Sequence, residues 1–197
     1  MSTLNEYLAQ KREAFHRLKA RALGSDAGPI ELRASAKAEG RSGIRRIRIR
    51  DHQVISDSSP DFAGYDLGPS SPELQLGIIG SCVTHITLIQ AADRGVPLDS
   101  LEVEVVGQID PRSGKPGFEQ IPVYPHNIRY TLNIVSPASS EEIAALHQAV
   151  EKACPILNLL RAPQTIQFTI NHRTDLPEAA VKSGSQKTVV AAAEACA

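Results

Sequence analysis

The longest apolar stretch of the chain runs from Glu73 to Arg94, where most residues are aliphatic or small. Pro72 and Glu73 are typical of a first helical turn that follows a serine cap at position 70 or 71. Gly95 is typical of a helix end. A helix that is apolar on all sides is normally buried by other parts of the protein on all sides. We therefore expect a central, buried helix here.

Apolar residues at helical spacing predict two further helices. The first lies within residues 1–24 and opens with a capping box at 3–6. We expect it to pack across a sheet or onto a partner subunit. The second follows a Ser-Ser-Glu-Glu cap at 139–142 and is interrupted at Pro155. Since proline is favoured at the first helical position, Cys154 can cap a fresh short helix.

Alternating apolar and polar residues predict strands before and after the central helix. Residues 30–39 alternate, a Gly-Arg-Ser-Gly turn follows at 40–43, and arginines alternate with isoleucines over 46–50, which predicts a hairpin. A short strand at 53–56 follows it. Further strands are expected at 101–105, 128–134 and 166–170. This order of helices and strands indicates an α+β domain with antiparallel pairing.

Three regions follow from these patterns. An N-terminal amphipathic helix occupies residues 1–25, an α+β domain residues 26–171, and a C-terminal tail residues 172–197. The tail is rich in Ala, Ser and Lys without a sustained pattern, so we expect it to be flexible and its Cys196 to be incidental.

Charge and composition narrow the class of protein. The formal net charge is −1, which gives no reason to expect a nucleic-acid or membrane partner. Arginines that alternate with apolar residues over 46–50 fit a solvated strand face. The first 24 residues lack a signal-peptide pattern, and no run approaches about 18 consecutive apolar residues. We therefore expect a cytoplasmic protein, whose three cysteines favour redox or metal chemistry over a disulfide framework.

Cys82 and Cys154 are the candidate reactive groups. A cysteine reacts as thiolate, which helix N-termini and nearby cations favour. The helix N-terminus at Pro155 can stabilise the thiolate of Cys154. Cys82 lies too deep in its own helix for this effect, so its thiolate needs an arginine from another part of the chain. Taken alone, a cysteine is more often a buried small apolar residue than a reactive group. His85, on the same helical face as Cys82, could be a base, a packed or surface residue, or a metal ligand with both thiols.

Residues 64–82, Gly-Tyr-Asp-Leu-Gly-Pro-Ser-Ser-Pro-Glu-Leu-Gln-Leu-Gly-Ile-Ile-Gly-Ser-Cys, resemble the signature of the OsmC/Ohr family. In that signature a Gly-Pro loop leads into a Glu-Leu-rich helix that ends in Gly-Ser-Cys. Residues 93–106 continue the similarity, and Ala-Cys-Pro-Ile-Leu at 153–157 resembles the second Cys-Pro motif of the family. The resemblance spans about residues 30–171. It implies antiparallel sheets wrapped around two long central helices in an intertwined homodimer, with two sites at the interface.

The resemblance also implies a thiol-dependent hydroperoxide reductase without a cofactor or metal. Cys82 would attack the peroxide and become a sulfenic acid, Cys154 would resolve it as a disulfide, and a dithiol such as dihydrolipoamide would restore the pair. Arg41 best matches the arginine that activates the thiol in the family, with Arg45 and Arg46 as alternatives.

One position departs from the family pattern. Pro72 stands where the best-characterised peroxidases have a glutamate that pairs with the arginine, and Glu73 follows it. Glu73 could take that role or serve as a first-turn helix carboxylate. The alternative to an enzyme is a non-catalytic member of the same fold, which binds a small ligand or senses oxidants.

Overall fold

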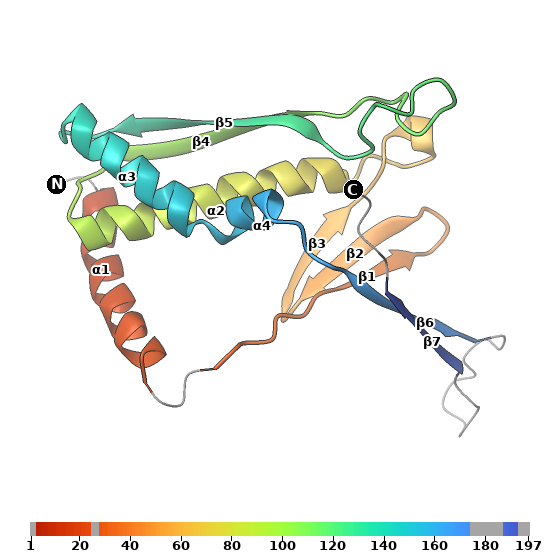
Figure 1. Cartoon of the computed structure of the whole chain (residues 1–197), viewed down its shortest axis with the longest axis horizontal. Coiled ribbons are helices and arrows are strands. Elements are labelled where there is room, and N and C mark those ends of the chain that lie inside the picture. Colours follow the sequence, from red (N-terminus) through yellow and green to blue (C-terminus); the bar gives the residue numbers. More distant parts are fainter. Residues whose placement is uncertain (1–2, 25–27, 174–186, 193–197) are drawn as a thin grey trace. The chain divides into compact units, whose positions relative to one another are not determined.

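The computed structural model describes residues 3–24, 28–173 and 187–192 (Figure 1). The chain divides into two compact units, Met1–Asn158 and Leu159–Ala197. The elements, in chain order, are α1 (Thr3–Ala22), β1 (Ser35–Glu39), β2 (Ile44–Ile49), β3 (His52–Ser56), a 3-10 turn (Pro60–Phe62), α2 (Ser71–Arg94), β4 (Ser100–Gln108), β5 (His126–Val135), α3 (Ser140–Ala153), α4 (Pro155–Arg161), β6 (Gln167–His172) and β7 (Lys187–Ala192).

The strands form three separate antiparallel groups in the described part of the chain. They are a three-stranded sheet in the order β1-β2-β3, a β4-β5 ribbon and a β6-β7 ribbon. This arrangement confirms the predicted α+β class with antiparallel pairing. Strand β7 lies inside the segment that we expected to be a flexible tail. Cys196 and the rest of that tail beyond 173 lie outside the described residues.

The first strand is shorter than its alternating pattern predicts. Pairing begins with Ser35 opposite Arg48, and β2 ends one residue later at Ile49. The chain then turns at Arg50, which has a positive φ of 53°. Residues 30–34 therefore have no strand to pair with, and the alternation there does not produce a ladder.

Helix α2 begins and ends where the sequence predicts. Ser70 is its N-cap, and Pro72 lies in its first turn. At the other end Gly95 adopts the left-handed conformation with φ 73°, which a glycine tolerates without the steric cost of a Cβ. Its backbone N–H then bonds back to the carbonyl of Ala92, so the last turn of the helix is closed.

Only one stripe of α2 is buried, although the sequence predicted cover on all sides. Helix α2 packs against α1, β4 and α3. On the uncovered side, Ile78 is 52% exposed. By length and composition alone, α2 could cross a membrane. The core helix of a globular protein passes the same test. The buried stripe consists of Ile79, Val83, Thr87, Ala91 and Ala92.

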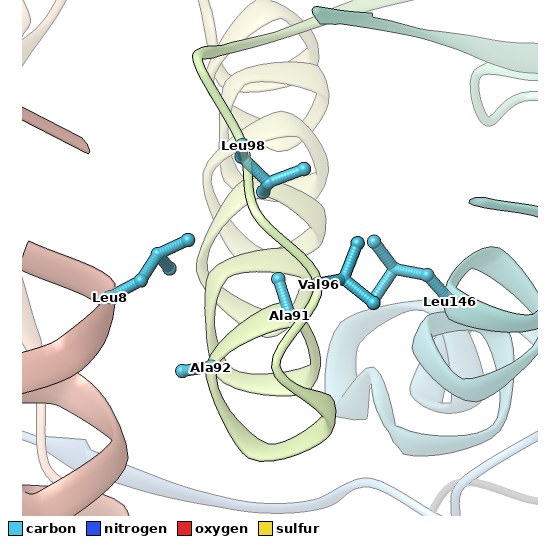
Figure 2. Packing of buried hydrophobic residues seen from close by; sticks show 6 residues of the cluster. All are labelled: Leu8, Ala91, Ala92, Val96, Leu98 and Leu146. Atoms are coloured by element: carbon cyan, nitrogen blue, oxygen red, sulfur yellow. The ribbon is translucent and has the colours of Figure 1, made fainter. Parts of the chain in front are cut away.

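Helix α1 packs on the end of α2 rather than across a sheet. Leu8 enters a core cluster formed with Ala91, Ala92, Val96, Leu98 and Leu146 (Figure 2). Polar contacts fix the same pair of helices. Arg12 Nε donates to the carbonyl of Ala92 over 2.6 Å, and His16 Nε2 lies 2.9 Å from a carboxylate oxygen of Asp93.

Helix α3 and α4 meet at a sharp junction. The predicted capping box is present, since the N–H of Ser139 donates to Glu142 and the N–H of Glu142 donates to the Ser139 hydroxyl. Helix α3 ends at Ala153, and α4 starts at Pro155, as the sequence predicts. The intervening residue, Cys154, is the C-cap of α3 with φ −72° and ψ 113°.

Candidate active site

The structure brings Cys82 and Cys154 together from positions 72 residues apart. Their sulfur atoms lie 3.4 Å from each other, with the Cys154 thiol oriented as donor. Both cysteines are free thiols, Cys154 fully buried and Cys82 partly buried. A disulfide bond is about 2.05 Å long, so a small approach of the two sulfur atoms would join them.

Apolar side chains surround the thiol pair. Cys82 packs against a buried cluster that contains Cys154 and draws residues from α2, α3 and α4. This burial raises the pKa of the Cys82 thiol, and the neighbouring Cys154 raises it further. A raised thiol pKa means that Cys82 needs help to lose its proton near neutral pH. The other buried members of this cluster are Ile79, Val83, Val150 and Leu157.

One backbone group favours the thiolate. The N–H of Ile156, in the first turn of α4, bonds to Cys82 and lowers the pKa of its thiol against the effect of burial. Pro155 has no N–H, so Ile156 supplies the first donor at the start of this helix. The sequence suggested that Cys154 would benefit from this helix start, but Cys82 receives the bond.

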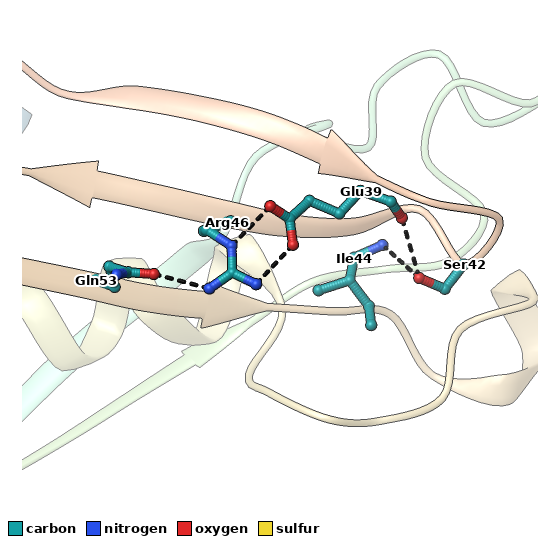
Figure 3. A network of polar contacts seen from close by, with 5 residues as sticks. All are labelled: Glu39, Ser42, Ile44, Arg46 and Gln53. Carbon is teal, nitrogen blue, oxygen red and sulfur yellow. Dashed lines mark hydrogen bonds and ion pairs between the residues drawn. The ribbon is translucent and has the colours of Figure 1, made fainter.

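Two of the three candidate arginines are held by other groups. Arg46 forms a bidentate ion pair with Glu39, each N–O distance being 2.7 Å, and also donates to Gln53 (Figure 3). This pair lowers the pKa of Glu39. Arg45 donates to the hydroxyl of Ser58 and to the backbone carbonyl of Asp57. Both guanidinium groups therefore stabilise the β1-β2-β3 sheet and the loop after it.

Arg41 is placed differently. It lies in the turn between β1 and β2, between the left-handed Gly40 and Gly43, and its side chain is exposed. Within the described residues, the structure gives Arg41 no hydrogen bond or ion pair and does not bring it to Cys82. Unlike those of Arg45 and Arg46, the guanidinium group of Arg41 is therefore available to a group from another molecule.

Glu73 caps helix α2. A single carboxylate oxygen, Oε2, accepts from both the backbone N–H and the hydroxyl of Ser70, each over 2.7 Å. The hydroxyl bond is the main cause that lowers the pKa of Glu73. Of the two roles open from the sequence, the first-turn carboxylate is the one that these contacts fit. In the part of the chain that the structure describes, Glu73 bonds to Ser70 and not to an arginine.

A buried aspartate that the sequence analysis missed organises the loop before α2. Asp57 is 1% exposed, and its carboxylate accepts the backbone N–H groups of Ser58, Tyr65 and Leu67. The bond from Ser58 is the largest of the effects that lower the pKa of Asp57. An aspartate at the start of a Ser- and Pro-rich loop is a signal for such turns. The loop is therefore a fixed structure that positions the start of α2.

A shallow groove of about 350 Å³ runs along α2 beside the partly buried thiol. His85 lies in this groove, as its spacing from Cys82 predicts. Partial desolvation of the ring lowers the pKa of His85, and the ammonium of Lys11 on α1 lowers it further. No three His, Cys, Asp or Glu side chains lie together as a metal site within the described ranges. The groove is lined by Leu74, Gly77, Ile78, Ser81, Cys82 and His85.

Comparison with known proteins is consistent with this geometry. A sequence profile of the OsmC-like protein family matches residues 64–169, more than half of the 197-residue chain. This range holds both thiols, the capped start of α2 and the α3–α4 junction. It begins after the β1-β2-β3 sheet, so α1 and the three candidate arginines, Arg41, Arg45 and Arg46, lie outside it. Among curated protein sequences, none matches the chain.

Solved structures share the fold at low sequence identity. An OsmC-like protein from Mycoplasma pneumoniae has a TM-score of 0.57 and 19% identity, over 68% of this chain and 89% of its own. An OsmC-like protein of unknown function from Vibrio cholerae has a TM-score of 0.51 and 14% identity, over 66% and 93%. A putative osmotic stress induced and detoxification response protein from Psychrobacter arcticus has a TM-score of 0.51 and 13% identity, over 68% and 90%.

Proposed function

This chain belongs to the OsmC-like protein family, and we propose that it is a thiol-dependent hydroperoxide reductase. The observation that carries the proposal is the 3.4 Å approach of Cys82 and Cys154, two free thiols from separate helices. Two thiols at this distance can be joined and separated with little motion of the backbone.

The proposed reaction has three steps. The Cys82 thiolate attacks the terminal oxygen of an organic hydroperoxide, the O–O bond breaks, and a sulfenic acid and an alcohol form. The Cys154 sulfur then attacks the sulfenic sulfur and displaces water, which leaves a Cys82–Cys154 disulfide. A dithiol such as dihydrolipoamide reduces this disulfide and is itself oxidised. We place this cycle in the cytoplasm, where thiols are kept reduced.

A homodimer is the second part of the proposal, because the single chain leaves apolar surface uncovered. Ile47 and Val54 face each other across β2 and β3, and Val54 is 37% exposed. Ile78 on α2 is 52% exposed. A second copy would cover these faces and could bring its Arg41 to the thiol pair. Sedimentation equilibrium should then give twice the 21.2 kDa of one chain, and a monomer at micromolar concentration would refute the dimer.

Disulfide mapping tests the chemistry directly. The reduced protein is treated with stoichiometric cumene hydroperoxide, and its peptides are analysed by mass spectrometry before and after dihydrolipoamide. We expect a Cys82–Cys154 bond that forms within seconds and disappears with the dithiol. Thiols that stay reduced, or that overoxidise without joining, would favour the second candidate, a ligand-binding or redox-sensing protein of the same fold, whose groove beside Cys82 would hold the ligand.

A further inference from the structure

The groove beside Cys82 contains a second titratable side chain, His85. The reaction proposed above gives His85 no role. The two residues are three positions apart on α2, so their Cβ atoms lie about 5–6 Å apart on one helical face. An imidazole at this spacing can reach a neighbouring sulfur directly or through one water molecule.

Cys82 needs a proton acceptor, as its surroundings indicate. Its sulfur packs against an apolar cluster, which disfavours the charged thiolate. Arg45 and Arg46 are engaged with the sheet and the following loop, and a guanidinium can stabilise a thiolate but cannot accept a proton. Among the residues that line the groove, His85 is the side chain that can accept one.

We propose that His85 is the general base and acid of the peroxide step, an inference that rests on the proposed function. Its free ring nitrogen takes the S–H proton of Cys82. The thiolate attacks the terminal oxygen of the hydroperoxide, the O–O bond breaks, and the alkoxide leaves. The alkoxide then takes the proton from the imidazolium. A thiol and a hydroperoxide thus give a sulfenic acid and an alcohol, and His85 returns to its neutral form.

Helix α1, which packs against α2, contributes a charged group that acts on this base. The ammonium of Lys11 disfavours the imidazolium of His85. Lys11 is held in place by a hydrogen bond of 3.2 Å to the Tyr7 hydroxyl one turn earlier. The lowered pKa makes neutral His85 a weaker base toward the thiol, and it makes the imidazolium a stronger acid toward the departing alkoxide. This gives a role to a helix outside the matched residues 64–169.

The test compares His85→Gln with His52→Gln, a matched change at an exposed histidine on β3. The rate of Cys82 alkylation by iodoacetamide is measured against pH, with each cysteine quantified separately by peptide mass spectrometry. We expect His85→Gln to slow alkylation about tenfold at pH 7 and to converge on the parent rate above the thiol pKa. The His52 variant should match the parent. A superimposable profile for His85→Gln would overturn the proposal.

Single-turnover kinetics with cumene hydroperoxide separate this inference from the proposed function. His85→Gln should slow sulfenic acid formation about 10²-fold, and an unchanged rate in a parent that turns over would refute His85 alone. If the parent does not consume peroxide but its Cys82 alkylation depends on His85, the thiol–imidazole pair stands and the peroxidase function fails. In Lys11→Met, the pKa of the His85 ring, followed by NMR titration, should rise because the ammonium that lowers it is gone. An unchanged pKa would show that Lys11 on α1 does not act on His85.

Discussion

Replacement of Cys82 by serine should reduce cumene hydroperoxide consumption at least about 10³-fold, to the rate measured without protein. A serine hydroxyl has no accessible alkoxide form at neutral pH and cannot form a sulfenic acid. The Cys154→Ser change has a different expected result. Cys82 should still react rapidly, but consumption should stop after about one peroxide per chain, because no thiol remains beside the sulfenic acid to resolve it.

The two variants are compared by peroxide consumption over time and by the mass of the oxidised protein. Cys196→Ser is the matched control, since the sequence gives this third cysteine no role, and it should keep the parent rate. The proposed chemistry fails if Cys82→Ser still consumes peroxide with the parent's kinetics. It also fails if Cys154→Ser completes many cycles with dihydrolipoamide as the sole reductant.

Gly64→Ala should be the most damaging small substitution outside the thiol pair. A Cβ at this position would lie 1.9 Å from the carbonyl oxygen of Ser58, well inside van der Waals contact. The contact is with backbone, so no side chain can rotate away. The loop that Asp57 holds would have to open, and we expect unfolding free energy to fall by about 1–3 kcal/mol or more.

Chemical denaturation with urea measures this loss. Gly28→Ala is the control, because nothing lies within 4 Å of a Cβ built at that glycine, and its midpoint should stay close to that of the parent. Because the same loop leads into α2, Gly64→Ala should also weaken the Ser70–Glu73 cap. Equal midpoints for the two variants would show that the loop can adjust at little cost.

The sequence predicts those parts of the fold that depend on short-range residue patterns. A serine cap, a proline in the first turn and a left-handed glycine set the two ends of α2. Pro155 marks the break between α3 and α4 because it lacks an N–H. The pairing of Cys82 with Cys154 followed from the family resemblance, since nothing local to either residue indicates that their sulfur atoms meet.

The features that escaped prediction depend on contacts between distant residues. The ladder of β1 starts at Ser35 because β2 ends at Ile49, and the alternation over 30–34 carries no information about its partner. Likewise, the sequence does not show that Arg46 pairs with Glu39 in the sheet or that Arg45 donates to Ser58 and Asp57 in the following loop. The burial of Asp57 depends on a loop path that only the folded chain reveals.

The hydrogen bond from Ile156 to Cys82 has a consequence for the redox equilibrium of the pair. A thiolate accepts this N–H well, whereas a disulfide sulfur is a poor acceptor and leaves the donor without a good partner. The bond therefore stabilises the reduced state in its thiolate form, which makes the disulfide more oxidising once Cys82 is deprotonated. We expect the oxidised pair to be readily reduced by a dithiol donor.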